Sequence, residues 1–177
     1  MEPTSRHDLV RVLVTGRPRP QHLRAVVQEV YSAREFWLRP GEDFEFVHRS
    51  TAWAQHAPEP GDEVLLFLAP VHGRWYQDTR GSDLTVDGSG ARLRYRAEHA
   101  AVLGSAEVPA VLREGCLPHP ERPGYVTFDR VLMEAHLRAV IAGAGLPTAP
   151  WSGRQRRAEA VKRRWPRLRL RWSDLLR

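Results

Sequence analysis

The chain has 177 residues, of which 42% are hydrophobic and 27% charged, and its formal net charge is +6 at pH 7. These values predict a soluble protein with one domain-sized core, and no apolar run approaches the ~20 residues of a membrane-spanning helix. The single cysteine, Cys116, excludes an internal disulfide, and the N-terminus lacks the layout of a secretory signal. We therefore expect a cytoplasmic protein with no membrane partner. One lysine among 27 basic residues further indicates a GC-rich bacterial genome.

The first 33 residues predict two helices. Residues 5–15 begin with Ser5, a suitable N-cap, and place Leu9, Val12 and Leu13 at helical spacing. Residues 20–33 carry apolar side chains at i, i+3, i+4, i+7 and i+8, namely Leu23, Val26, Val27, Val30 and Tyr31. We expect the two helices to be short neighbours that pack on another part of the protein.

The middle of the chain predicts strands. Residues 63–69 form a nearly continuous apolar run, which is typical of a strand covered on both faces. In the strand at 91–96, Leu93 and Tyr95 alternate with arginines, which indicates one buried and one wet face. The other expected strands are residues 36–38 and 44–47, joined as a hairpin, residues 74–77 after a turn at 72–73, and residues 84–86, joined to 91–96.

Helices return after residue 105. Residues 108–114 predict a short helix, and residues 116–124, with three prolines, predict a loop. A longer helix is expected over residues 128–142, with Thr127 as N-cap and an i, i+4 ion pair between Glu134 and Arg138. Its expected apolar side consists of Phe128, Val131, Leu132, Ala135, Ala139 and Ala142.

The last 27 residues concentrate the positive charge. They hold ten Lys or Arg and two acids, so they carry +8 and residues 1–150 carry about −2. Ser152 and Gln155 fit a capping box, which predicts a helix over residues 153–165 that Pro166 ends. Residues 167–172 then alternate arginine with Leu168, Leu170 and Trp172, as in a half-buried strand.

These patterns predict an α+β fold. We expect a mainly antiparallel sheet of about five or six strands, flanked by N-terminal and C-terminal helices, in a single domain over residues 1–150. Residues 151–177 would form a basic helix–strand element packed on the same domain.

No sequence motif predicts catalysis, a metal site or a cofactor. Cys116 and His119 have C-x-x-H spacing, but a structural zinc site needs about four ligands and the chain has no second cysteine. An enzyme with a site assembled from His48, His99, Asp78 or Cys116 is the third hypothesis. We expect these residues to be ordinary surface or buried side chains.

Two charged surfaces are the candidate binding sites. The basic one consists of Arg154, Arg157, Lys162, Arg164, Arg167, Arg169 and Arg171, and the acidic one of Glu42, Asp43, Glu45, Asp62, Asp78 and Asp83. The leading hypothesis is a non-catalytic protein that binds a protein partner, as a bacterial immunity or adaptor protein does. The alternative is nucleic-acid binding through the basic surface, with phosphate contacts from arginine and base stacking on tryptophan. The oligomeric state stays open.

Overall fold

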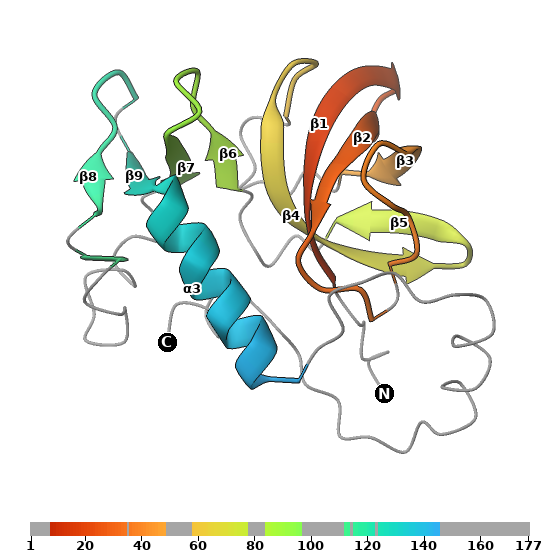
Figure 1. Cartoon of the computed structure of the whole chain (residues 1–177). Helices are drawn as coiled ribbons and strands as arrows, with labels where there is room; N and C mark the ends of the chain where they lie inside the picture. Colours follow the sequence, from red (N-terminus) through yellow and green to blue (C-terminus); the bar gives the residue numbers. More distant parts are fainter. Residues whose placement is uncertain are drawn as a thin grey trace, which may run out of the picture.

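The computed structural model describes residues 8–34, 36–48, 58–77, 84–96, 112–113, 115–122 and 124–145. About half of these residues lie in strands. The elements are β1 (Asp8–Arg19), β2 (His22–Val30), β3 (Asp43–Val47), β4 (Glu63–Val71), β5 (Arg74–Gln77), β6 (Leu84–Val86), β7 (Arg92–Arg96), β8 (Leu117–Pro118), β9 (Tyr125–Asp129) and α3 (Arg130–Gly143) (Figure 1). The predicted α+β fold with helices at both ends is therefore wrong, because the described part of the chain is mostly sheet.

Five strands close into a barrel. Their order is β1-β2-β3-β5-β4, and a pairing between β1 and β4 completes the ring. All neighbours are antiparallel except β3 and β5, which pair in parallel. Because β4 returns to lie beside β1 after the β1–β2–β3 meander, the barrel has a Greek-key connection.

A smaller sheet extends from one side of the barrel. β4 pairs with β6 as well as with its barrel neighbours, and the sheet continues through β7 and β9 to β8. α3 follows directly on β9 and lies against this extension (Figure 1). Asp129 caps the helix by accepting a hydrogen bond from the Leu132 amide, so the predicted cap at Thr127 is wrong.

β4 joins the two hydrophobic cores, as its continuous apolar run predicted. Val64, Leu66 and Leu68 point into the barrel, where they meet aromatic side chains from the 36–46 segment and β5. Leu65 and Phe67 point the other way, into a second core between the extension and α3. All five side chains are at most 2% exposed, which confirms that both faces of this strand are covered.

The two predicted N-terminal helices are wrong, since residues 8–19 and 22–30 form β1 and β2. In β2, Leu23, Ala25 and Val27 are buried in alternation, which is the period of a strand. Val26 on the other face is partly buried, and a register shift between Val27 and Glu29 brings Val30 back against the barrel core, so these apolar residues reproduce helical spacing by chance. Valine in such numbers favours a strand, where its branched side chain packs on the pleated surface.

The other local predictions have mixed outcomes. Strands at 44–47, 63–69 and 74–77 are confirmed, as is the hairpin of β6 and β7. Residues 36–38 do not form a strand, because β3 pairs with β2 and β5 instead. The loop expected at 116–124 contains the two-residue strand β8. The helix and strand predicted within 151–177 lie outside the described residues, and so does most of the helix predicted at 108–114.

A candidate anion-binding cleft

A cavity of about 660 Å³ opens along β7, and we call it the β7 cleft. One side is formed by Asp62, just before β4, and by the turn between β6 and β7. The other side is the segment 117–122, which contains β8. Its charged lining residues are Arg92, Arg94, Arg122, Asp62, Asp87 and Glu121, and His119 lies beside them.

The alternation of β7 directs its arginines toward this cleft. Leu93 and Tyr95 are buried in the second core, so Arg92 and Arg94 project from the opposite face. The prediction of one buried and one wet face is thereby confirmed for residues 92–95. The neighbouring strand β9 presents Thr127 on the same face, directly opposite Arg94 in the ladder.

Arg92 is held in place by uncharged acceptors. Its Nε donates to Thr127 Oγ1 at 2.8 Å, and its Nη2 donates to the carbonyl oxygens of Gly115 at 2.7 Å and Thr127 at 3.0 Å. These bonds fix the guanidinium without compensating its charge, because no carboxylate takes part in them. Arg92 is therefore a positive group in the lining of the cleft whose position three hydrogen bonds fix.

Arg94 and Arg122 form the least satisfied part of the cleft. In the described structure, neither guanidinium has a hydrogen bond or an ion pair, and Arg94 instead lies 5.8 Å from the Tyr125 ring centroid in a cation–π contact. Burial lowers the pKa of Arg94, and the positive charge of Arg122 lowers it further, while Asp62 and Asp87 oppose the shift. A second positive charge beside a half-buried guanidinium is unfavourable until an anion binds between them.

Two of the three acidic lining residues, Asp62 and Asp87, accept hydrogen bonds from nearby residues of their own turns. Asp62 accepts a hydrogen bond from the Glu59 amide at 2.8 Å. Asp87 accepts from Ser89 Oγ at 2.7 Å and from the Arg92 amide at 3.2 Å, and these bonds hold its pKa below the usual value although burial opposes them. These carboxylates stabilise turns, which is the common role of aspartate in such positions.

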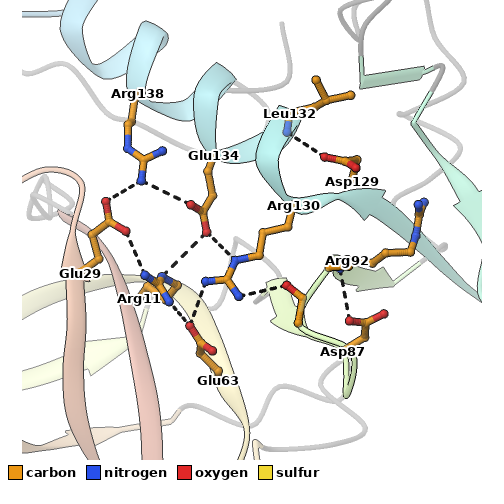
Figure 2. A network of polar contacts seen from close by, with 12 residues as sticks. Arg11, Glu29, Glu63, Asp87, Arg92, Asp129, Arg130, Leu132, Glu134 and Arg138 are labelled. Carbon is orange, nitrogen blue, oxygen red and sulfur yellow. Dashed lines mark hydrogen bonds and ion pairs between the residues drawn. The ribbon is translucent and has the colours of Figure 1, made fainter.

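A second charged cluster joins the barrel to α3, and Figure 2 shows it. Its members are Arg11, Glu29, Glu63, Arg130, Glu134 and Arg138. Arg11 bonds to Glu63 and, at 3.0 Å, to Glu29, and Glu134 contacts Arg130 at 2.9 Å and Arg138 at 3.3 Å. The predicted Glu134–Arg138 pair is thus confirmed.

The positive and negative charges of this cluster are paired with one another. Burial alone would lower the pKa of Arg11, but its hydrogen bonds to Glu63 and Glu29 raise it above the usual value. Burial likewise opposes the shift at Glu29, whose pKa Arg138 and Arg11 hold below the usual value. Three arginines face three glutamates, so the cluster holds α3 on the barrel and offers no charge to a ligand.

Four of the six residues of the predicted acidic surface are described by the structure. Glu42 accepts a hydrogen bond from the Arg39 amide in the turn before β3, and Glu45 pairs with Arg24 on β2. Asp43 is an exposed residue at the start of β3. Asp62 belongs to the β7 cleft. Asp78 and Asp83 lie outside the described residues, as does the entire predicted basic surface from Arg154 to Arg171.

The predicted catalytic candidates are not brought together in the described part. Burial raises the pKa of the Cys116 thiol, which packs against the second core and is therefore a poor nucleophile. His119 lies in the cleft, where its Nδ1 accepts from the Glu121 amide at 3.1 Å. His48 is buried, and His99 and Asp78 lie outside the description. Among the described residues, no three potential metal ligands lie close together.

Comparison with known proteins adds no identification. No family model, curated protein or solved structure matches the chain significantly. In the part of the chain that the structure describes, no helix has the length and apolar character to cross a bilayer.

Proposed function

We propose that this protein binds a phosphate-bearing ligand in the β7 cleft and acts as a binding protein. The observation that carries the proposal is the pair Arg94 and Arg122, which line one cavity and have no carboxylate partner among the described residues. Arg92 adds a third guanidinium whose position is fixed by three hydrogen bonds. Planar guanidinium groups suit the several oxygen atoms of a phosphate, which accept parallel hydrogen bonds.

The fold is compatible with a phosphate-bearing ligand. Small Greek-key barrels of five strands include the OB-folds, which bind oligonucleotides and oligosaccharides on the barrel surface and its loops; the β7 cleft lies in the sheet extension beside this barrel. The Tyr125 ring beside Arg94 provides an aromatic surface close to the positive groups. Arginine next to an aromatic ring is the usual combination for single-stranded nucleic acid, where phosphates and bases alternate.

Binding by the full chain tests the proposal. Inorganic phosphate, a mononucleotide and a fluorescently labelled single-stranded oligonucleotide would be titrated separately, so that the three sources of phosphate are distinguished. Each charged hydrogen bond contributes about 1.5–3 kcal/mol, so Arg94→Gln and Arg122→Gln should each weaken binding by about 10- to 100-fold. Arg74→Gln is the matched control, because Arg74 is an exposed arginine at the start of β5 and does not line the cleft.

Two results would contradict the proposal. One is that the wild-type protein binds none of the three ligands. The other is that Arg94→Gln and Arg122→Gln bind as the wild type does, while substitution of Arg167, Arg169 and Arg171 by glutamine abolishes binding. The second result would favour nucleic-acid binding through the basic C-terminal residues. The hypothesis of a protein partner stays a prediction and would be tested by complex formation with candidate toxins.

A further inference from the structure

Arg130, the first residue of α3, connects three separate parts of the structure. Its backbone amide donates to Ala91 O at 3.0 Å, and its Nη1 donates to Gly90 O at 3.2 Å, in the turn between β6 and β7. Its Nη2 donates to Glu63 at 3.2 Å on β4, and its Nε donates to Glu134 at 2.9 Å on the helix (Figure 2). One guanidinium therefore holds the turn, the barrel and α3 together.

The parts that Arg130 connects also contribute to one side of the β7 cleft. The turn contributes Asp87 and Gly88 to the cleft, and the barrel contributes Asp62, the residue before Glu63. The turn is internally bonded, since the Gly90 amide donates to Asp87 O and the Asp87 amide donates to Arg92 O. A displacement of Gly90 is thus transmitted to Asp87 and to the first residue of β7.

We infer that Arg130 is a positioning residue for the cleft: by tying the turn to Glu63 it fixes the side formed by the turn and Asp62, and with it Arg92 at the start of β7, relative to the 117–122 segment. This inference rests on the proposed function, because the position of this side matters only if a ligand binds between it and the 117–122 segment. The role requires the planar fork of arginine, since Nη1 and Nη2 bond in two different directions. A lysine at this position would keep the charge but could not hold both partners in fixed geometry.

Arg138 provides a matched control within the same cluster. Like Arg130, it pairs with Glu134 across one helical turn. Its other contacts are Glu29 at 2.6 Å and the Tyr31 ring at 5.2 Å, both on the barrel side. In the described structure it makes no contact with the turn between β6 and β7. Replacing the Arg138 guanidinium therefore weakens the contact between α3 and the barrel, and the contacts that hold the turn between β6 and β7 remain.

The test compares Arg130→Lys with Arg138→Lys in the full-length protein. Affinity would be measured for the phosphate ligand that the wild type binds, together with amide hydrogen exchange at Gly90, Ala91 and Arg92. Coupling between distant sites typically amounts to about 5- to 150-fold, so Arg130→Lys should weaken binding by about fivefold or more. It should also speed exchange in the turn, and Arg138→Lys should change neither quantity.

The outcomes separate this inference from the proposed function. Equal affinities of the two variants, or unchanged exchange in the turn of Arg130→Lys, would overturn the positioning role even when the wild type binds phosphate and Arg94→Gln does not. Absence of binding in the wild type would instead overturn the proposed function, and the ligand-directed part of this inference with it. Unfolding curves of both variants show whether a general loss of stability explains a difference.

Discussion

Substitution of Glu134 by glutamine should destabilise the fold by about 2–4 kcal/mol. The Glu134 side chain is 11% exposed and contacts Arg130 at 2.9 Å, Arg138 at 3.3 Å and Arg11 at 3.9 Å. A hydrogen bond to a charged group contributes about 1.5–3 kcal/mol, and the Arg130 bond, between two mostly buried groups, falls in this range. Arg138 is 51% exposed, so solvent screening reduces its part to about 0.3–0.5 kcal/mol.

The remainder of the effect comes from uncompensated charge. Without the Glu134 carboxylate, three arginines face only Glu29 and Glu63. Removal of one member of a buried ion pair typically costs about 3–5 kcal/mol, and partial exposure of this cluster places the expected value below the top of that range. The total is a large fraction of the roughly 5–15 kcal/mol by which domains are stable.

Urea unfolding followed by tryptophan fluorescence measures this change as a difference in the free energy of unfolding at constant m-value. Glu45→Gln is the control, since it removes the same charge from the exposed Glu45–Arg24 pair, whose side chains are 37% and 56% exposed. That pair should contribute less than about 1 kcal/mol. Equal effects of the two substitutions would refute the argument, because they would show that solvent screens the cluster at α3 as fully as it screens the surface.

Two further predictions concern the faces of α3 and the acid stability of the barrel. Leu137→Ala should cost about 2–5 kcal/mol and Val131→Ala less than about 0.5 kcal/mol, because Leu137 is fully buried and Val131 is 75% exposed; equal losses in thermal or urea unfolding would contradict the helix orientation. Burial, together with Arg17, lowers the pKa of His48 to about 4, whereas the unfolded chain keeps about 6.5. The unfolded chain therefore binds a proton that the folded protein excludes, and stability should fall by up to about 3 kcal/mol as the pH decreases from 6.5 to 4. His48→Gln should remove this part of the pH dependence, and identical pH profiles of the two proteins would count against it.

The sequence predicted most strands of the middle region, with the exception of residues 36–38, and failed on the first two strands of the chain. Residues 63–69 were identified because a run buried on both faces needs no knowledge of its neighbours. In β1 and β2 the apolar residues also lie on both faces, and the spacing then fits a helix as well as a strand. The decisive contact is the pairing of β1 with β4, in which Leu13 lies opposite Glu63, fifty residues along the chain. Local periodicity carries no information about such a pairing.

The predicted apolar side of α3 was also wrong, for a different reason. The row from Val131 through the alanines is exposed or partly exposed, and the helix buries Met133, Leu137 and Ile141. These three larger side chains remove more apolar surface from water than the alanines could. The same orientation buries Glu134, which is favourable only because Arg11 and Arg130 lie beside it.

Some properties of the candidate site, such as the direction of its arginines, can be predicted from the sequence, and others, such as their contacts, arise only on folding. The alternating pattern of β7 predicted that Arg92 and Arg94 project from the face opposite the core, and in the structure both line the cleft. The sequence could not show that Arg92 would be fixed by Thr127 or that Arg122 would approach Arg94, because these contacts depend on the pairing of β7 with β9 and of β9 with β8. An arginine becomes a candidate ligand-binding group when folding leaves its charge without a partner. In the cluster at α3 every arginine is in direct contact with a glutamate, whereas in the β7 cleft no described ion pair joins Arg94 or Arg122 to the lining carboxylates Asp62, Asp87 and Glu121. The difference between a structural clamp and a candidate binding site in this molecule therefore lies in whether the carboxylates contact the arginines directly.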